Sequence, residues 1–458
     1  MMAALDLAKL AAGVGAAYEG RPLLIHGAAI DSRRVEVGDL FVAVTGERVD
    51  GHDYVSDAAE RGAVAALTQR AVEASIPCIV VEDSLAALTE IARRNRDAFG
   101  GCVLAITGSC GKTSVKNICR AIFEEAAPTV ATRGNYNNEI GVPLTLTRLA
   151  DDVQFAVVEM GATGRGDVAR LCELARPRVS AVLNAMEAHL DGFGSVDDVA
   201  RIKAEIYDGL DGDAVAVLGL DSTYMELWRE RIAVTGARIV TWSLLAGADV
   251  HASAIDDLGA EGSAFELHVG DATRSVKLPL PGRHNVSNAL VAAALAYAAG
   301  LEIDAIAAGI ARAEGEAGRL QHRRLADGTV LIDDSYNANP GSVRAAIDFL
   351  ADREGRRCLI LGEMLELGSD AAALHAQMGR RAREAGIDTF VGVGAALAPA
   401  VEAFGDGAEL FSGREDLAPH LSELLLRSDR ILVKGSRGAA METVIADLCA
   451  AAEGDRSC

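Results

Sequence analysis

The segment with the clearest chemical meaning reads Gly108-Ser109-Cys110-Gly111-Lys112-Thr113 and directly follows an apolar run at 102–106. In this arrangement a buried strand leads into a glycine turn whose backbone N–H groups can surround phosphate oxygens. Lys112 adds a cation for the outer phosphates, and the Thr113 hydroxyl can bind Mg²⁺ at a helix N-terminus. The segment therefore predicts a nucleoside triphosphate site.

The spacing of this loop departs from the usual P-loop, which has four residues between its first glycine and its Gly-Lys pair. Gly108 stands two positions too late, and Ile106 occupies the place of the early glycine. A chance Gly-Lys-Thr at a helix start is the alternative, but strand, glycines, lysine and hydroxyl all occur in order. The departure indicates a subclass of phosphate loop.

Three more side chains lie at or after the neighbouring expected strands. Glu159 ends an apolar strand, so its carboxylate is expected at the sheet edge of the phosphate loop, where it can bind Mg²⁺; a solvated strand-end acid is the alternative. His189 follows another expected strand, although a lone histidine is more often structural. Lys203 lies in a helical stretch and, taken alone, is expected to be an exposed helix lysine.

Three polar segments lie at expected strand or helix ends. The segment 281–288 precedes an alanine-rich helix, and its amides can either reach a nucleotide base or cap the helix. The segment 333–340, Asp-Asp-Ser-Tyr-Asn-Ala-Asn-Pro, is too polar for a simple turn to be the favoured explanation. Lys434 and Arg437 place two cations at a glycine turn, which suits a carboxylate or a phosphate; a solvated loop is the alternative.

The composition limits the functions that fit. The chain has 458 residues, 50% of them apolar, which suits three domains with stable cores. Acidic residues exceed basic ones by 66 to 44, and no long basic cluster interrupts them, so a large nucleic-acid surface is not expected.

The N-terminus lacks a signal-peptide pattern, and the longest apolar run, 289–301, is too short to cross a bilayer. We therefore expect a cytoplasmic protein without membrane insertion. The 8 cysteines form no CxxC pair, so neither a disulfide framework nor a zinc site is indicated.

The order of expected elements predicts an α/β protein of three domains, at residues 1–100, 101–318 and 319–458. A small α/β domain comes first, with a strand at 39–44 and helical stretches from Tyr54 and Leu85. A mostly parallel central sheet follows, with strands at 103–107, 155–159, 179–183 and 214–218. A second, Rossmann-like sheet closes the chain, with strands at 329–333, 357–361, 389–393 and 430–433 and helices at 342–351 and 371–385.

Together these segments resemble the Mur ligases, the ATP-dependent amide-forming enzymes of peptidoglycan precursor synthesis. The shortened loop at 107–113 is this family's form of the P-loop. Within the family, the segments 134–145, 333–340, 362–368 and 434–442 resemble the member that adds D-alanyl-D-alanine to a UDP-N-acetylmuramoyl-tripeptide. Residues 31–33, 38–43 and 50–53 resemble the UDP-sugar domain that this member shares with the diamino-acid-adding ligase. The resemblance covers nearly the whole chain.

The resemblance implies an N-terminal domain for the UDP group, a central P-loop ATPase domain for ATP and Mg²⁺, and a C-terminal Rossmann-like domain that closes over nucleotide and incoming amine. It implies an acyl phosphate intermediate, which the amine of D-alanyl-D-alanine attacks with release of phosphate. The implied catalytic residues are Lys112, His189 and Lys203, and the implied metal ligands are Thr113, Glu159, His189 and Lys203 as a carbamate. The implied ATP-binding residues are Gly108, Ser109, Cys110, Gly111, Lys112, Thr113, Asn285, Asn288, Arg319, Asp334, Tyr336 and Asn337. The implied substrate-binding residues are Ser32, Arg33, Thr45, Gly46, Asn137, Asn138, Lys434, Ser436 and Arg437.

Three alternatives stay open at this level. The diamino-acid-adding ligase typically carries an Asp-Asn-Pro-Arg motif that this chain lacks, and folylpolyglutamate synthases lack this kind of N-terminal domain. A P-loop ATPase that drives a switch would not need a UDP-sugar domain. Two small departures from the family pattern occur: Ala204 replaces a common glycine, and Glu187 makes the segment before His189 unusually acidic. A monomer is the default expectation, and no motif indicates whether the third residue of the tripeptide is meso-diaminopimelate or lysine.

Overall fold

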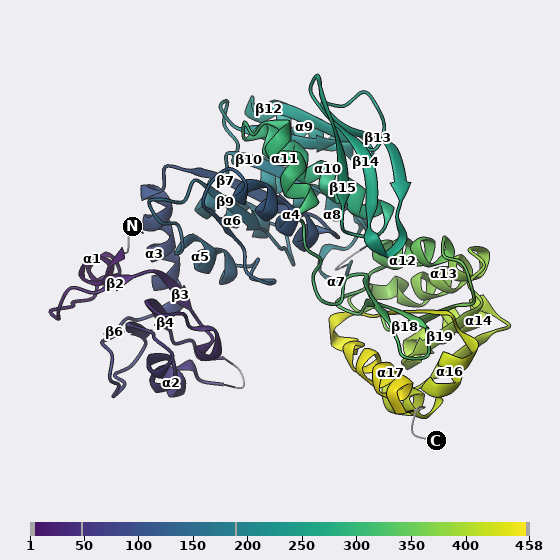
Figure 1. The fold of residues 1–458 in the computed structure, drawn as a ribbon. Coiled ribbons are helices and arrows are strands. Elements are labelled where there is room, and N and C mark those ends of the chain that lie inside the picture. The colour runs from purple at the N-terminus through teal and green to yellow at the C-terminus, as the bar shows by residue number, and fades with distance from the viewer. Residues whose placement is uncertain (1–4, 47–48, 188–189, 455–458) are drawn as a thin grey trace.

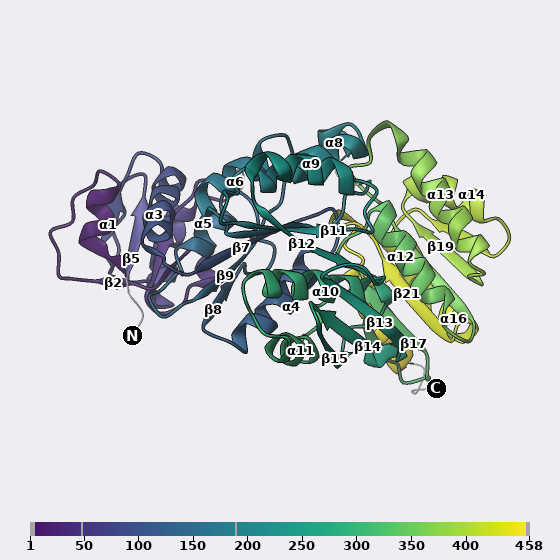
Figure 2. The same ribbon diagram turned by 90° about the horizontal axis from the view of Figure 1, so that it is seen from above.

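The computed structural model describes residues 5–46, 49–187 and 190–454. The chain forms three α/β bodies in sequence order, from the purple N-terminal body through the blue-to-green central body to the green-to-yellow C-terminal body (Figure 1). Seen from above, the central sheet lies between two layers of helices (Figure 2). The mixed α/β architecture with parallel sheets agrees with the fold class expected from the sequence.

The N-terminal body contains a four-stranded parallel sheet in the order β3-β4-β5-β6. Its strands are β3 (Gly27–Ala29), β4 (Asp39–Val42), β5 (Ala65–Thr68) and β6 (Cys78–Val80), and its helices are α1 (Leu7–Gly13), α2 (Val55–Glu60) and α3 (Ser84–Ala98). A short antiparallel pair, β1 (Leu5–Asp6) and β2 (Leu24–Ile25), lies beside them. The start of α3 is set by Asp83, whose carboxylate accepts hydrogen bonds from the N–H groups of Leu85 and Ala86.

The central body is built on a nine-stranded sheet in the order β15-β14-β13-β12-β11-β10-β7-β9-β8. The strands are β7 (Cys102–Thr107), β8 (Thr129–Ala131), β9 (Phe155–Glu159), β10 (Val179–Val182), β11 (Val215–Gly219), β12 (Arg238–Ser243), β13 (Val250–Asp257), β14 (Ser263–Val269) and β15 (Ala272–Leu278). The seven strands from β7 to β13 run parallel, in line with the expected mostly parallel sheet, whereas β14 and β15 are each added antiparallel to the preceding strand, an extension that was not predicted from the sequence. The strand positions predicted at 103–107, 155–159, 179–183 and 214–218 agree with β7, β9, β10 and β11 to within a residue.

Helices cover both faces of this sheet because successive residues of the buried strands point to opposite faces. Leu104 and Ile106 of β7 belong to a core with α4 (Lys112–Glu124), α10 (Arg283–Ala298) and α11 (Ile303–Ala311). Val103 and Ala105 pack on the other side, where the helices are α5 (Gly141–Leu146), α6 (Asp167–Ala175), α8 (Val196–Lys203) and α9 (Met225–Thr235). A short helix, α7 (Leu190–Phe193), precedes α8. Within the described ranges, no helix combines the length and apolar character needed to cross a membrane.

The C-terminal body has a six-stranded sheet in the order β16-β17-β21-β18-β19-β20, in which only β16 is antiparallel to its neighbour. The strands are β16 (Gln321–Arg324), β17 (Val330–Asp334), β18 (Arg357–Gly362), β19 (Thr389–Val393), β20 (Ala408–Phe411) and β21 (Arg430–Lys434). One core forms against α12 (Pro340–Ala351), α13 (Ala371–Glu384) and α14 (Ala398–Phe404), the other against α15 (Arg414–Leu417), α16 (Leu421–Arg427) and α17 (Glu442–Gly454). The predicted strands and the helices at 342–351 and 371–385 coincide with these elements within a few residues.

The registers of the two larger sheets bring polar strand ends together. Glu159 pairs with Ile106 across β9 and β7, one residue before the phosphate loop begins. Asp334 pairs with Lys434 across β17 and β21. Because carboxyl ends of parallel strands share one sheet edge, both edges present polar side chains to the space between the two bodies.

Candidate active site

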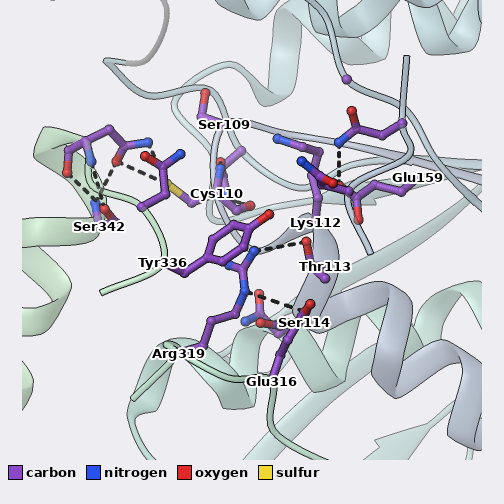
Figure 3. Close-up of a pocket in the computed structure, with 18 of the residues that line it drawn as sticks. Ser109, Cys110, Lys112, Thr113, Ser114, Glu159, Glu316, Arg319, Tyr336 and Ser342 are labelled. Carbon is purple, nitrogen blue, oxygen red and sulfur yellow. Dashed lines mark hydrogen bonds and ion pairs between the residues drawn. The ribbon is translucent and has the colours of Figure 1, made fainter. Parts of the chain in front are cut away.

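A cavity of about 560 Å³ lies between the central and C-terminal bodies. The central body contributes the phosphate loop at 109–113, Glu159, Asn184 and Lys203, and the C-terminal body contributes Arg319, Asp334, Tyr336 and the start of α12. Figure 3 shows Arg319 and Tyr336 approaching the phosphate loop from the opposite side. The site is therefore assembled from segments more than 200 residues apart in the chain.

The phosphate loop connects β7 to α4 through a left-handed glycine. Gly111 has φ +81 and stands directly before α4, and a Cβ there would lie 2.7 Å from the Asn288 side-chain oxygen. Only glycine satisfies both constraints without strain. Lys112 folds back and donates a hydrogen bond to the Gly108 carbonyl at 2.6 Å. Burial lowers the pKa of Lys112, and the nearby Glu159 carboxylate opposes this shift.

Two asparagines bracket Cys110 within the loop. Asn184, just beyond β10, accepts a hydrogen bond from the Cys110 N–H at 2.9 Å and donates to the Cys110 carbonyl at 3.1 Å. Asn339 caps α12 by accepting from the Ser342 N–H at 2.9 Å, and its amide nitrogen lies 3.1 Å from the Cys110 sulfur. The loop is thus held by one residue from each body, and neither asparagine was singled out from the sequence. Asn339 lies in the polar segment 333–340, which was the available signal.

Glu159 has the environment of a metal ligand. It is 1% exposed, its Oε1 accepts a hydrogen bond from the Asn137 amide at 2.7 Å, and its Oε2 has no partner among the described residues. An unpaired buried carboxylate oxygen is costly unless a cation or donor approaches it. Within the described ranges no three His, Cys, Asp or Glu side chains gather as a metal cage. This donor set suits Mg²⁺, which one or two carboxylates and substrate phosphates commonly hold.

Lys203 contradicts the expectation from its helix alone. It is 1% exposed rather than a surface lysine, because α8 continues into a turn, Ala204–Tyr207, whose residues are all buried. Its ammonium lies 5.8 Å from the Phe193 ring centroid, and Lys203 lines the cavity. Burial, reinforced by the nearby charge of Lys112, lowers the pKa of Lys203 well below its ordinary value. His189, predicted beside it, lies outside the described residues.

The C-terminal body supplies a guanidinium, an aromatic ring and an ion pair. Arg319 stacks over the Tyr336 ring at 4.3 Å and donates to the Thr113 hydroxyl at 3.0 Å. The Lys434 ammonium bonds Asp334 at 2.6 Å and the Asn337 carbonyl at 2.9 Å. Lys434 is 3% exposed, so the solvated-loop alternative for this residue is wrong.

The predicted adenine-side amides lie on the first turns of α10. Asn285 donates to the Pro281 carbonyl at 2.8 Å and accepts from Asn288 at 2.9 Å. Both residues line the cavity, and neither caps the helix, which begins after Gly282 without a side-chain cap. The capping alternative for this segment is therefore wrong.

The predicted substrate residues fall into two groups. Asn137, Asn138 and Lys434 line the cavity, whereas Ser32, Arg33, Thr45 and Gly46 belong to the N-terminal body and do not. Ser436 is buried and donates to the Ala338 carbonyl at 3.1 Å, so it supports the 333–340 segment from behind. Arg437 is exposed and pairs with Glu442 at 3.0 Å. Glu316, close to the expected boundary between the second and third domains, forms an ion pair with Arg319 at 3.7 Å and lines the cavity, which no sequence signal indicated.

Family models match three stretches of the chain. They are described as "Mur ligase family, catalytic domain" at residues 24–96, "Mur ligase middle domain" at 106–296 and "Mur ligase, glutamate ligase domain" at 318–437. The chain is 40% identical over 449 residues to the UDP-N-acetylmuramoyl-tripeptide–D-alanyl-D-alanine ligase of Escherichia coli, a match that covers 97% of this chain and 98% of that protein. The chain belongs to the Mur ligase family.

Solved structures give the same family. A crystal structure of MurF from Acinetobacter baumannii matches with a TM-score of 0.87 and 33% identity, covering 98% of this chain and 100% of that one. MurF ligase from Thermotoga maritima in complex with ADP matches with a TM-score of 0.78 and 27% identity, covering 94% and 98%. The predicted family resemblance is confirmed.

Proposed function

We propose that this chain is an ATP-dependent ligase that joins D-alanyl-D-alanine to a UDP-N-acetylmuramoyl-tripeptide. The observation that carries the proposal is the 40% identity, over nearly the full length of both chains, to a relative named for this reaction. The cavity supports it, because a phosphate loop, an unpaired buried carboxylate and cationic side chains of a second body meet there. The diamino-acid-adding and folate-type alternatives are not favoured by these relatives.

The reaction proceeds in two displacements. A carboxylate oxygen of the tripeptide attacks the γ-phosphorus of ATP, the bond to the ADP oxygen breaks, and an acyl phosphate forms. The neutral amine of D-alanyl-D-alanine then attacks the acyl carbon, loses a proton and expels inorganic phosphate. Because the carboxylate and the γ-phosphate are both anions, the first step needs cations in a site from which water is excluded.

Lys112 and the backbone N–H groups of the phosphate loop hold the ATP phosphates in this proposal. Lys112 exchanges its bond to the Gly108 carbonyl for phosphate oxygens, at little cost because the ammonium is already partly desolvated. Thr113 and Glu159 would hold Mg²⁺, which supplies charge neutralisation between the reacting anions. Arg319, now on the Thr113 hydroxyl, lies within reach of the same phosphates.

Lys203 and His189 are proposed for a second metal position, with Lys203 as a carbamate. A carbamate forms from CO₂ and a neutral amine, and the burial that lowers the pKa of Lys203 favours the neutral amine. The cavity gives CO₂ a route to this nitrogen. The modified side chain would place an anion beside the Lys112 ammonium, which would repel a protonated Lys203.

The remaining predicted residues are assigned to nucleotide and substrates. Asn285 and Asn288 would contact the adenine, Asp334 the ribose, and Tyr336 and Asn337 the adjacent part of the nucleotide. The residues proposed for the UDP-sugar peptide and the incoming dipeptide are Ser32, Arg33, Thr45, Gly46, Asn137, Asn138, Lys434, Ser436 and Arg437. Since Asp334 neutralises Lys434, we expect Lys434 to act mainly by orienting Asp334 and Asn337.

The proposal keeps the predicted domains at 1–100, 101–318 and 319–458 as units that bind UDP-substrate, ATP and incoming amine. It takes the working enzyme to be a monomer, because residues of one chain assemble the cavity. We place the reaction in the cytoplasm, since it consumes ATP and a UDP-linked substrate.

Product formation tests the proposal directly. Purified protein with ATP and Mg²⁺ is given the UDP-tripeptide alone, D-alanyl-D-alanine alone, both, or neither, and ADP, phosphate and the UDP-pentapeptide are measured. We expect stoichiometric ADP and pentapeptide only with both substrates. Rapid ATP turnover with neither substrate would instead indicate an ATPase that drives a switch.

A further inference from the structure

Lys116 is a buried lysine to which the proposed reaction assigns no role. It lies one turn beyond Lys112 on α4, is 4% exposed, and donates a hydrogen bond to the Gly134 carbonyl at 3.2 Å. Burial lowers the pKa of Lys116, and Glu159 and Glu316 oppose the shift, which places both carboxylates in its surroundings. A single hydrogen bond to a carbonyl does not repay the desolvation of an ammonium, so stability alone does not explain a lysine here.

The turn that Lys116 holds contacts the N-terminal body. Arg133 makes two hydrogen bonds to the Glu36 carboxylate, at 2.7 Å and 3.0 Å. The guanidinium of Arg34 lies 5.3 Å from the centroid of the Tyr136 ring. Both contacts join the segment 133–136 to the body that carries the proposed UDP-binding residues.

The same turn also contacts the candidate metal carboxylate. Asn137 donates to Glu159 Oε1 at 2.7 Å, and its carbonyl accepts from the Gly161 N–H at 2.7 Å. Gly134 itself has φ +51, a left-handed conformation that favours glycine, and its carbonyl accepts the hydrogen bond from Lys116. Five residues of chain therefore connect the N-terminal body, Lys116 and Glu159.

We propose that Lys116 is a positioning residue that couples the seating of the UDP-substrate domain to the orientation of Glu159 at the ATP site. Its ammonium fixes the 133–137 turn to α4, the helix that begins at the phosphate loop. When the N-terminal body moves on substrate binding, the Arg133 and Tyr136 contacts move the turn, and Asn137 carries that movement to Glu159. Without Lys116 the turn keeps its contacts with the N-terminal body but is no longer held to α4, so its movement no longer sets Glu159 at a fixed position relative to the phosphate loop. The inference rests on the proposed function, since it takes the N-terminal body to bind the UDP-substrate.

Calorimetric binding tests this coupling without requiring turnover. The dissociation constant of the UDP-tripeptide is measured with and without a non-hydrolysable ATP analogue and Mg²⁺, in the wild type and in Lys116→Met, which keeps the length of the side chain. We expect the analogue to tighten UDP-tripeptide binding about tenfold in the wild type and by less than about twofold in Lys116→Met. Affinity for the analogue alone should not change, because Lys112 and the loop are intact.

Three further variants separate coupling from simple damage. Lys116→Arg keeps the cation and should restore most of the coupling, and Arg120→Met on the exposed side of the same helix should behave as wild type. Arg133→Gln removes the partner on the N-terminal side, where both charges are about half exposed, so this variant is expected to fold normally and to lose the coupling as well. In the double variant Lys116→Met, Arg133→Gln the losses of coupling should not add, since both substitutions break the same connection.

Specific results would overturn the inference. If Lys116→Met folds and the ATP analogue still tightens UDP-tripeptide binding as in the wild type, Lys116 is excluded as the connection. If Lys116→Met does not fold, the same result in Arg133→Gln excludes it. Additive losses in the double variant do the same. Failure of the wild type to bind the UDP-tripeptide or to form pentapeptide would count against the proposed function itself, which keeps the two failures distinct.

Discussion

Lys112 and Lys203 show how two buried lysines in one cavity are prepared for different chemistry. Burial lowers the pKa of Lys112, but the Glu159 carboxylate opposes this shift and the Lys112 ammonium donates a hydrogen bond to the Gly108 carbonyl. Lys203 is buried near the Phe193 ring and is repelled by Lys112, so its neutral form is favoured. The first arrangement suits an anion-binding cation, and the second suits an amine that reacts with CO₂.

Replacing Lys112 should remove catalysis and leave the fold intact. Lys112→Ala deletes a charge that acts mainly while the γ-phosphate is transferred, so we expect kcat to fall about 10²- to 10³-fold. Steady-state pentapeptide formation and thermal unfolding are measured together, with the exposed Lys277→Ala as control. Retention of most of the wild-type kcat would remove Lys112 from the ATP site.

The carbamate at Lys203 predicts dependence on dissolved CO₂. Activity should fall in rigorously CO₂-depleted buffer and return on addition of bicarbonate, and ¹³C-bicarbonate should give a carbamate signal in NMR that Lys203→Ala lacks. Lys203→Ala is expected to be nearly inactive, whereas Lys203→Glu, shorter but anionic, should keep part of the activity. An alanine variant with full activity would show that the side chain has no catalytic role.

At the scale of elements, α13 holds the loop that follows β18. The ring of His375 on α13 accepts a hydrogen bond from the Met364 N–H at 3.1 Å, and its other nitrogen lies 2.8 Å from the Ala371 carbonyl. One nitrogen must accept and the other donate, which only the neutral ring does. Burial accordingly lowers the pKa of His375 below its ordinary 6.5.

This histidine makes the stability of the C-terminal body fall in acid. The unfolded chain takes up a proton near pH 6.5, and folded His375 does so only at lower pH, so the stabilisation is complete above pH 6.5 and is lost as the pH falls below it. We expect His375→Gln, which can still accept and donate, to weaken the fall in melting temperature between pH 7 and pH 5.5. Identical pH profiles for the two proteins would contradict the assignment.

At the scale of the whole molecule, both boundaries of the central body carry charge pairs. At the C-terminal boundary two arginines pair with the central body, Arg344 of α12 with Glu187 at 2.8 Å and Arg353, just beyond α12, with Asp257. At the N-terminal boundary Arg148 pairs with Glu36 at 2.9 Å and Asp39 at 3.1 Å. Asp39 is buried, but each of the other three pairs has at least one partly exposed member, and such pairs are individually weak and salt-sensitive, which suits bodies that move.

Solution scattering can follow the expected closure. The radius of gyration should decrease when an ATP analogue and the UDP-tripeptide are added together, because the C-terminal body must cover the acyl phosphate site. The double variant Arg344→Ala, Arg353→Ala should close less completely, and wild-type closure should weaken at high salt. Arg381→Ala, whose exposed pair with Asp348 lies within the C-terminal body, is the matched control. No compaction at saturating ligand would exclude this closure.

Patterns of neighbouring residues accounted for much of the fold. The strands at 103–107 and 389–393, the helix at 371–385 and the phosphate loop follow from apolar runs and glycine positions that act over short distances. The antiparallel β14 was missed although its residues alternate between buried and half-buried, a signal typical of a strand with one covered face. The family resemblance, carried by contiguous motifs, was equally available from the sequence.

The sequence by itself determined the family, the order of the elements and the candidate phosphate and carboxylate residues. Only the tertiary structure decided that Lys203 is buried, that Asn339 and Asn184 hold Cys110, and that Lys116 connects Glu159 to the N-terminal body. The reason is physical: burial and pairing depend on which distant segments pack together, and residues 110 and 339 meet because the carboxyl edges of two separate sheets face each other. A local sequence pattern indicates the structure that each segment prefers. It does not indicate which distant residue will shift the pKa of a side chain or accept its hydrogen bond.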